Sequence, residues 1–535
     1  MNEFDYVVVG AGSAGCVLAN RLSEDPGIRV LLIEAGGEDS HPLIKVPKGF
    51  AQVMDSPRTA WHFPVRPFGP TDKVEVWPRG KVLGGSSSIN GMVYNRGNRA
   101  DYDALVRLGN PGWGWDTILP IFKQIEDHEL GASDVRGSGG PLHISAVSPA
   151  ESDDLCEETI ASGVELGWQR EQDLNATDDE RIGYTMATIK NGRRVSAAAA
   201  FLHPVKRRPN LTIAVNTLVL RIVVQDGKAV GVRTHQDGRT VDYAAAREVI
   251  VAAGSIATPK LLQLSGIGPA DTLRSAGVDV LVDSPNVGAR MREHRVFKLQ
   301  FRLIENLGYN RVLNTKPRQA MAGVRYLVTR RGPLALPVHD VTGFFKTRPE
   351  LDRPDAQLLT APFSAGPQVP GKQLPLEREP GAMCLGTILR PDSAGSIRIT
   401  SADPDAPLEI VPNYLATEHD RRVGVDLFRR LRELFATGPI ARRVKAETLP
   451  GPEVRSEQEI IDAAFEHGYC GYHAIGTCAM GPDEDDVVDP QLRVRGVANL
   501  RVVDASVLPI MVSGNLNGPV MAMAWRAADI VLGRP

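Results

Sequence analysis

The chain has 535 residues, a length that predicts two domains or one domain with a large insertion. Its hydrophobic and charged fractions, 42% and 23%, are ordinary for a globular protein, and a net charge of −3 without a basic block argues against a nucleic-acid partner. No apolar run reaches about 18 residues, so we expect no integral membrane segment, and the early first strand leaves no room for a signal peptide. The five cysteines are scattered and odd in number. They favour a reducing compartment without a metal site, so we expect a cytoplasmic protein or one bound peripherally to a membrane.

The segment VVVGAGSAGC, residues 7–16, predicts a dinucleotide-binding turn. Residues 6–9 are apolar and β-branched, as in a buried parallel strand, and the three glycines allow a tight turn and close approach of a pyrophosphate. The helix that follows, predicted over residues 14–23, offers free amides to an anion. A second strand over residues 29–33 ends at Glu34, whose carboxylate can accept hydrogen bonds from an adenosine ribose. The same negative charge disfavours a 2′-phosphate, so NADP is not expected.

The pattern then becomes irregular before helices follow. Residues 36–76 are rich in prolines and predict loops. Residues 78–97 combine a glycine pair with three serines, a composition suited to a loop that wraps a polar ligand. Apolar residues spaced three and four apart predict helices over residues 102–109 and 115–127.

The second half of the chain contains two kinds of pattern. Short β-branched runs within residues 211–253 predict strands, and a helix is expected to begin at about Thr258. Residues 296–466 alternate apolar strands with polar and proline-rich loops, which fits an antiparallel sheet with helices. A strand over residues 499–506 and a helix over residues 519–533 return to the first pattern. The cofactor domain is therefore expected to be discontinuous in sequence.

Five motifs, in this order, make the chain resemble the glucose–methanol–choline (GMC) oxidoreductases, a family of FAD-binding enzymes. They are GAGSAG with Glu34, GKVLGGSSSIN, GSIATPKLLQLSGIG, HAIGTCAMG and VVDASVLPIMVSGNLNGPVMAMA. The resemblance covers nearly the whole chain and favours FAD over NAD. It implies a mixed α/β and α+β fold, with a discontinuous Rossmann-like FAD-binding domain and an antiparallel-sheet substrate domain. The FAD-binding domain would comprise residues 1–155, 209–295 and 467–535, the last with the catalytic residues, and the substrate domain residues 156–208 and 296–466.

The resemblance also implies where FAD binds. The glycine pair of the second motif would lie along the pyrophosphate, the residues after it by the isoalloxazine, and the backbone of Val219 at the adenine. Some family members tether FAD through a histidine at the position of Ile89, so we expect the FAD here to be non-covalent. The expected FAD contacts are Gly10, Gly12, Ser13, Ala14, Gly15, Glu34, Ala35, Trp61, Arg79, Gly80, Leu83, Gly84, Gly85, Ser86, Asn90, Gly91, Met92, Val93, Val219, Ala253, Gly254, Asp504, Ala505, Asn515 and Pro519.

Oxidation of an alcohol by a flavin needs a base for the hydroxyl proton and a carbinol C–H that faces flavin N5. Imidazole, with an ordinary pKa of about 6.5, is a natural base, and the resemblance assigns this role to His473. Asn517 matches the second catalytic position and would orient the hydroxyl by a hydrogen bond. We expect His467 at the rim of the pocket, His294 near the domain junction, and Asn515 as a support for the turn that presents Asn517.

These features lead to the hypothesis of an FAD-dependent alcohol dehydrogenase or oxidase acting on an uncharged primary alcohol, whether aromatic, aliphatic or polyether. The sequence GTCAMG resembles bacterial dehydrogenase members, which favours a quinone- or dye-type acceptor over O2. A flavin-bound, non-redox lyase of the hydroxynitrile-lyase type is the alternative. A non-catalytic binding protein is a third class, against which the retention of His473 and Asn517 argues. The oligomeric state is left open.

Overall fold

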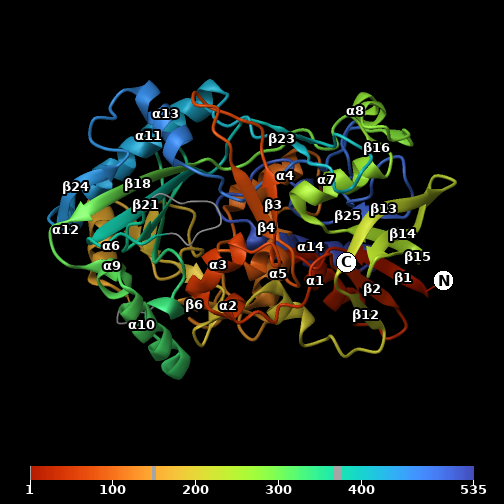
Figure 1. Cartoon of the computed structure of the whole chain (residues 1–535), viewed down its shortest axis with the longest axis horizontal. Helices are drawn as coiled ribbons and strands as arrows, with labels where there is room; N and C mark the ends of the chain where they lie inside the picture. The colour runs from red at the N-terminus through yellow and green to blue at the C-terminus, as the bar shows by residue number, and fades with distance from the viewer. Residues whose placement is uncertain (1, 147–151, 367–374, 535) are drawn as a thin grey trace.

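The elements fall into two groups along the long axis of the molecule (Figure 1). The structure is a computed structural model that describes residues 2–146, 152–366 and 375–534. One group, at the right of Figure 1, contains a sheet with strands from both the N-terminal and the C-terminal parts of the chain. The other group, at the left, contains a second sheet covered by α11 and α13. This arrangement, with one mixed sheet and one largely antiparallel sheet, confirms the predicted fold class.

The first sheet has the strand order β12-β2-β1-β15-β14-β13, and β25 pairs with β15. The strands β12, β2, β1, β15 and β25 are parallel, whereas β13, β14 and the first part of β15 form antiparallel hairpins. The inner parallel strands β1, β2 and β25 and the parallel end of β15 are buried on both faces, as continuous Val and Ile runs predict, whereas the edge strand β12 is partly exposed. Their bounds are β1 Asn2–Val9, β2 Val30–Ile33, β12 Leu211–Ala214, β13 Thr217–Gln225, β14 Lys228–Gln236, β15 Arg239–Val251 and β25 Leu500–Val502.

Helices cover this sheet and carry the predicted motifs to its edge. The helix α1 (Ser13–Leu22) follows β1 directly and packs against α14 (Asn517–Val531), which in turn contacts α5 (Trp115–Ile125). The helix α4 (Arg99–Arg107) begins with a capping box formed by Asn98 and Asp101. The helix α7 (Gly254–Leu264) begins earlier than the predicted Thr258, because Gly254, at φ +86°, turns the chain straight from β15 into the helix.

The second sheet has the order β24-β18-β21-β20-β19-β8-β7 and is antiparallel except for the β7–β8 pair. Its face is covered by α6, α11 and α13, whose apolar side chains form one core with Phe297 and Leu299 of β18. The antiparallel sheet predicted for residues 296–466 is confirmed. The bounds are β7 Gln169–Arg170, β8 Arg181–Tyr184, β18 Val296–Leu303, β19 Val341–Phe345, β20 Ala356–Ala361, β21 Gly381–Ile388, β24 Val444–Leu449, α6 Asp154–Glu165, α11 Glu418–Phe435 and α13 Glu457–His467.

Residues 36–76, predicted to be a loop-rich region, contain several short helices and strands. The segment contains α2 (Pro42–Lys45), α3 (Phe50–Asp55) and β3 (Ala60–Pro64), which pairs with β4 (Val76–Gly80). The prolines do not prevent these elements, because Pro42 occupies the first turn of α2, where no backbone N–H is needed. The segment packs through a small apolar cluster of Ile44, Val53, Ala60, Val82 and Ile89.

Shorter elements connect the two groups. The five-segment division into domains stays a prediction, and within residues 156–208 the strand β8 joins the second sheet whereas η4 packs on α1. Within the described residues, no helix is both long and apolar enough to cross a membrane. The shorter elements are η1 Pro47–Gly49, η2 Gly85–Ser88, β5 Glu126–His128, β6 Leu142–Ala146, β9 Met186–Ala187, β10 Ile189–Lys190, β11 Arg193–Arg194, η4 Ala198–Leu202, β16 Ile267–Gly268, α8 Ala270–Ser275, β17 Val282–Asp283, α9 Gly308–Leu313, α10 Lys316–Thr329, η5 Pro333–Ala335, β22 Ser396–Arg398, β23 Glu409–Val411, α12 Gly438–Ala441 and η6 Ala505–Val507.

Candidate functional site

The three glycines after β1 have different roles. Gly10 adopts φ +100°, and a Cβ there would lie 2.6 Å from the carbonyl oxygen of Ala252 on the neighbouring strand end. A Cβ on Gly15 would lie 1.8 Å from the carbonyl oxygen of Gly10, so these two positions exclude any side chain. At Gly12 a Cβ would meet nothing within 4 Å. The turn therefore leaves open space beside the N-terminus of α1, where a phosphate group can approach the backbone.

The second motif lies directly on this turn. The backbone N–H of Gly84 donates to the carbonyl oxygen of Ala11 at 2.8 Å, and a Cβ on Gly85 would lie 2.7 Å from the Cα of Gly12. The start of α7 borders the same turn, since a Cβ at Gly10 would lie 3.0 Å from the Cα of Ala253, and a Cβ at Gly254 would meet nothing within 4 Å. Three predicted FAD segments, far apart in sequence, thus meet around one open region. The other expected contacts on these segments are Ser13, Ala14, Gly80, Leu83, Ser86, Gly91, Met92, Val93 and Ala253. Ala505 lies on η6, which packs on α7, and Pro519 lies on α14, which packs on α1.

Glu34 is tied into the turn more firmly than its place at a strand end suggests. Its carboxylate accepts the backbone N–H of Ala11 at 2.9 Å and that of Gly36 at 2.8 Å. Burial raises the pKa of Glu34 to about 7, against the effect of these two hydrogen bonds. The carbonyl oxygen of Glu34 accepts the N–H of Thr217, which brings the start of β13, with Val219, beside it. Ala35 lies between these contacts, so the residues predicted to contact the adenosine lie close together.

Arg194 was missed by the sequence analysis. Its buried guanidinium donates to the carbonyl oxygens of Ile44 and Ser87 and, at 2.7 Å, to the side-chain oxygen of Asn90, while one terminal nitrogen has no partner. Burial lowers the pKa of Arg194 to about 9, and within the described residues no carboxylate forms an ion pair with it. A buried cation without a counter-ion, against the second motif, suits an anionic or electron-rich part of FAD. The only sequence signal is an arginine pair ahead of an alanine-rich run.

His473 lies at the centre of a chain of side-chain contacts. Its Nδ1 is 2.9 Å from Nδ1 of His294, and its Nε2 is 3.1 Å from the amide nitrogen of Asn515. The two imidazole rings are nearly perpendicular, at 85°. Beneath them the buried carboxylate of Glu293 accepts the backbone N–H groups of both histidines, at 2.7 Å from His473 and 2.8 Å from His294. The backbone at the two rings is therefore fixed by a single side chain.

The contacts also determine which ring nitrogen of His473 carries the proton. Nε2 of His294 lies 3.2 Å from the carbonyl oxygen of Leu389, and because a carbonyl can only accept, we assign the proton to this nitrogen. Nδ1 of a neutral His294 then has a lone pair, so Nδ1 of His473 must donate to it. Nε2 of His473 is therefore unprotonated, and its lone pair accepts a hydrogen bond from the side-chain NH2 of Asn515 at 3.1 Å. The orientation of Asn515 agrees, since its side-chain oxygen accepts from Gln357 at 3.1 Å and its NH2 group therefore faces His473.

The surroundings keep both histidines neutral. Desolvation lowers the pKa of His473 well below its ordinary 6.5, and the neighbouring His294 and Arg79 lower it further. Burial lowers the pKa of His294 to about 4. Arg79 lies 3.4 Å from Glu293 and near the ring of Tyr472, so it contacts the histidine turn and not the glycine turn. An unprotonated Nε2 is therefore available on His473 at neutral pH.

The two asparagines near the C-terminus lie in different places. Asn517 is the first residue of α14, and its side-chain oxygen accepts from the hydroxyl of Ser13 at 2.7 Å, at the start of α1. The amide that contacts His473 is Asn515, on the preceding turn at Gly514, which adopts φ +95°. The geometry is the reverse of the predicted assignment, because α14 packs on α1 and carries Asn517 toward the glycine turn.

Other predicted residues have mainly structural contacts. The carboxylate of Asp504 accepts from the N–H of Gly254 and the hydroxyl of Thr258, so it holds the first turn of α7. Trp61 lies on β3 opposite Arg79, with Lys81 Nζ 4.0 Å from its ring centre. His467 ends α13, and the charged groups that affect its pKa are Glu466, Lys73 and Lys298, none of which contacts His473.

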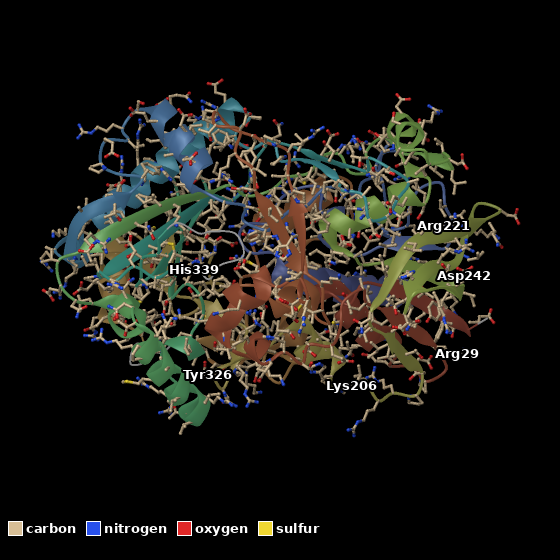
Figure 2. All side chains as sticks on the ribbon, viewed as in Figure 1. Arg29, Lys206, Arg221, Asp242, Tyr326 and His339 are labelled. Carbon is tan, nitrogen blue, oxygen red and sulfur yellow. The ribbon has the colours of Figure 1, made fainter. Side chains whose placement is uncertain are left out.

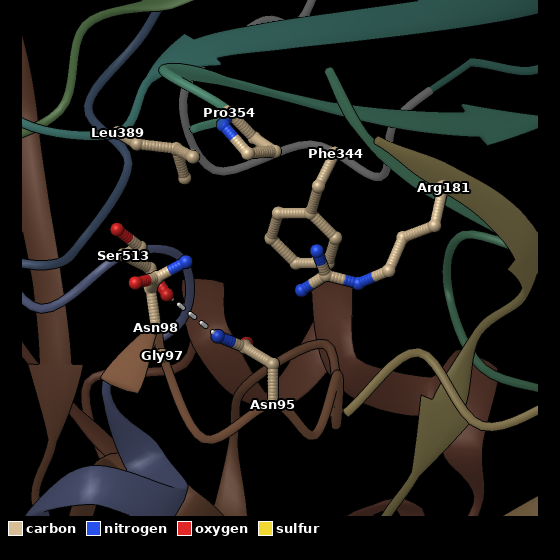
Figure 3. Close-up of a pocket in the computed structure, with 8 residues that line it drawn as sticks. All are labelled: Asn95, Gly97, Asn98, Arg181, Phe344, Pro354, Leu389 and Ser513. Carbon is tan, nitrogen blue, oxygen red and sulfur yellow. Dashed lines mark hydrogen bonds between the residues drawn. The ribbon is translucent and has the colours of Figure 1, made fainter. Parts of the chain in front are cut away.

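A small cavity lies behind the turn that carries Asn515 (Figure 3). Asn95 lines it, donating to the carbonyl oxygen of Ser513 at 3.0 Å and accepting the backbone N–H of Asn515 at 2.9 Å. The guanidinium of Arg181 lies over the ring of Phe344, 4.3 Å from its centre, as Figure 3 shows. The free volume is about 10 Å³, room for about one water. This cavity supports the asparagine turn and is too small for an alcohol substrate.

The glycine turn, the second motif and the histidine–asparagine pair define a class of flavoprotein oxidoreductase. Family models for the N-terminal and C-terminal parts of GMC oxidoreductases match residues 4–296 and 391–524, so the chain belongs to the GMC oxidoreductase family. It is an FAD-dependent flavoprotein, and its relatives support alcohol oxidation in general.

Individual relatives span the whole chain. An alcohol dehydrogenase [acceptor] of Pseudomonas putida is 38% identical, covering 99% of this chain and 96% of its own length. The mitochondrial choline dehydrogenase of Mus musculus is also 38% identical, covering 100% and 90%. Among solved structures, pyridoxine 4-oxidase from Mesorbium loti aligns with a TM-score of 0.88 at 31% identity, covering 98% of each chain. A formate oxidase of Aspergillus oryzae RIB40 aligns with a TM-score of 0.89 at 26% identity, covering 99% and 98%.

We predict that Glu34→Gln weakens FAD binding by about 1.5–3 kcal/mol, the range for a hydrogen bond to a charged group. Ribose hydroxyls donate to the ionised carboxylate, whose pKa in the cofactor-free protein is about 7. Cofactor affinity of the parent should therefore fall as the pH drops from about 7 to about 5, because protonation competes with binding. The variant should lose this dependence. Titration of the apoprotein with FAD, followed by flavin fluorescence, measures both effects.

The exposed Glu38→Gln is the control for Glu34→Gln, since it removes a nearby carboxylate outside the turn. Equal FAD affinity and equal pH dependence in the parent and in Glu34→Gln would show that Glu34 does not contact the ribose.

We predict that Arg194→Met lowers FAD affinity by about ten-fold or more while the melting temperature of the apoprotein stays close to that of the parent, because the loss of three hydrogen bonds is offset by the removal of a buried cation without a counter-ion. Arg193→Met is a matched control, since Arg193 is the exposed neighbour. Titration with FAD and thermal unfolding monitored by circular dichroism give the two readouts. A lower melting temperature with unchanged FAD affinity would mean that Arg194 only braces the loops around it.

Proposed function

We propose that the protein oxidises an uncharged primary alcohol to the aldehyde and passes the electrons to an acceptor other than oxygen, of the quinone or dye type. The observation that carries the proposal is the chain of contacts from His294 through His473 to Asn515, next to the FAD-binding segments. The name of the Pseudomonas putida relative, an alcohol dehydrogenase [acceptor], supports the acceptor class. Bound FAD supplies the hydride acceptor.

In this proposal His473 is the base. Its Nε2 is unprotonated, and when substrate enters between Nε2 and Asn515, Nε2 takes the proton of the substrate hydroxyl as the carbinol hydride leaves. The side-chain NH2 of Asn515 donates a hydrogen bond to the substrate oxygen and holds it near Nε2. As the imidazole gains charge, its Nδ1–H donates more strongly to Nδ1 of His294. Because the far end of this chain is the carbonyl oxygen of Leu389, which cannot take up a proton, the proton stays on His473.

The charges around the base favour an uncharged substrate over a cation such as choline. Arg79 lies close enough to lower the pKa of His473 by its charge, and it would repel a cation in the same way. The nearest carboxylate is Glu293, which already accepts two backbone N–H groups and the thiol of Cys470 and pairs with Arg79. Its charge is therefore not available to a trimethylammonium group. Tyr472 offers an aromatic surface beside Arg79.

The decisive experiment is anaerobic mixing of the holoenzyme with a panel of aliphatic, aromatic and polyether alcohols and with choline, followed at the flavin band. Loss of the yellow colour with uncharged alcohols, then faster reoxidation by a soluble quinone than by O2, is the expected result. Faster reoxidation by O2 would make the protein an oxidase. Absence of flavin reduction by every alcohol, combined with cleavage of a cyanohydrin, would replace the proposal with the non-redox lyase.

We predict that acid precipitation releases the FAD into the supernatant, because the cofactor is non-covalent. The position that some family members use for a tether is Ile89, which is buried in an apolar cluster with Ile44 and Val53 and offers no nucleophile. Absorbance of the supernatant at the flavin band measures the release. Yellow colour retained by the washed pellet would contradict the prediction.

We predict that His473→Ala slows flavin reduction by about 10² to 10⁴-fold, the usual contribution of a general base. Asn515→Ala should also slow it, and Asn517→Ala, two positions away, should slow it less. For the parent, the rate should stay constant down to about pH 6.5 and fall only below it, because desolvation lowers the pKa of His473. Stopped-flow reduction against pH measures all of these. A larger effect for Asn517→Ala than for Asn515→Ala, or a loss of rate beginning above pH 6.5, would contradict the assignment.

A further inference from the structure

The helix α10 presents an unusual surface. It projects from the body of the molecule at the lower left of Figure 1, and Tyr326 is its buried residue. The hydroxyl of Tyr326 donates to the carbonyl oxygen of Gly192 at 2.9 Å, and Figure 2 shows this residue on the side of α10 that faces the body. On the outside, four large apolar side chains are exposed by 61% to 78%: Met321, Val324, Leu327 and Val328.

These four side chains form one stripe. Successive residues of an α-helix are about 100° apart, so the four lie within an arc of about 120°. On the same projection Arg318 and Arg325 border the stripe on one side and Lys316 borders it on the other. The buried Tyr326 lies on the opposite face of the helix. Exposed apolar residues scattered singly are ordinary, but a continuous stripe on a projecting helix indicates a partner.

The charge around the stripe has one sign. Residues 306–339 contain no aspartate or glutamate and six basic residues: Arg311, Lys316, Arg318, Arg325, Arg330 and Arg331. Arg318 donates to a backbone carbonyl oxygen and to Asn314, and Arg330 lies over the ring of Tyr326. Among the residues that the structure describes, none of the six forms an ion pair with a carboxylate. The segment is thus a cationic region around an apolar stripe, without an acidic residue of its own.

We propose that α10 docks the protein on an anionic lipid bilayer. The apolar stripe would enter the boundary between headgroups and acyl chains, and the basic residues along its edges would contact lipid phosphates, as interfacial amphipathic helices do. A second copy of the chain fits less well, because pairing two stripes would bring two cationic regions together. The proposal does not depend on the alcohol substrate or on the electron acceptor.

The test is sedimentation of the holoenzyme with vesicles, using either neutral phosphatidylcholine alone or a mixture with phosphatidylglycerol. We expect binding to the anionic vesicles that weakens with added salt, and weak binding to the neutral ones. Met321→Ser/Val324→Ser/Val328→Ser should lower the partition coefficient by about ten-fold or more. Arg318→Gln/Arg325→Gln should lower it by about 25-fold, since each basic residue near the surface contributes about a five-fold change. Ile304→Ser, equally exposed but outside α10, is the matched control.

Two further measurements separate docking from damage to the fold. FAD content and flavin reduction by a soluble alcohol should be unchanged in every variant, because α10 contacts none of the FAD or base residues described above. Sedimentation velocity gives the oligomeric state. The proposal is overturned if the parent fails to bind anionic vesicles, if the control variant loses binding as much as the triple variant, or if the triple variant converts a dimer to a monomer without any change in vesicle binding.

Discussion

The buried carboxylate of Glu293 is the constraint on which the candidate catalytic site depends. It accepts the backbone N–H groups of His294 and His473, accepts from the thiol of Cys470, and pairs with Arg79. One side chain therefore joins three segments that are far apart in sequence. Burial raises the pKa of Glu293, yet the surrounding donors and Arg79 counteract that rise. A buried carboxylate with this many partners is a strong positional restraint, because releasing any one of them would leave charge or polarity unpaired.

The exclusion of water has different consequences around the two histidines and around Arg194. Around His473 and His294 it keeps the imidazoles neutral, so that a backbone carbonyl determines the direction of the hydrogen bonds and leaves Nε2 of His473 unprotonated. Around Arg194 it leaves a cation without a counter-ion beside the glycine-rich segments. The neutral imidazole of His473 is suited to accepting a proton, and the buried guanidinium of Arg194 is suited to contact with an electron-rich cofactor. Both properties depend on a low local dielectric.

The docking helix and the cofactor segments are linked by a short path. The chain leaves α10, passes through η5, and reaches Val338, which lies 3.6 Å from the place where a Cβ on Gly91 would be. Gly91 belongs to the segment predicted to lie by the isoalloxazine. A helix on the membrane surface would therefore sit one short segment away from the cofactor, a suitable arrangement for an acceptor that partitions into lipid.

Features that depend on residues close together in the sequence could be predicted from the sequence. The β1–α1–β2 unit and the antiparallel second sheet follow from the period of the apolar residues and from glycines that a turn requires, and these are local properties of the chain. The FAD cofactor follows from the resemblance of five sequence motifs to the GMC oxidoreductases. Tertiary structure alone decided which side chains meet. Asn515 and Asn517 are two residues apart, and only the packing of α14 on α1 directs the second one to Ser13 and leaves the first at His473. The contacts of His294 with His473 and of Arg194 with Asn90 also became visible only in the tertiary structure. Contacts between distant segments arise from packing, which no local sequence pattern encodes.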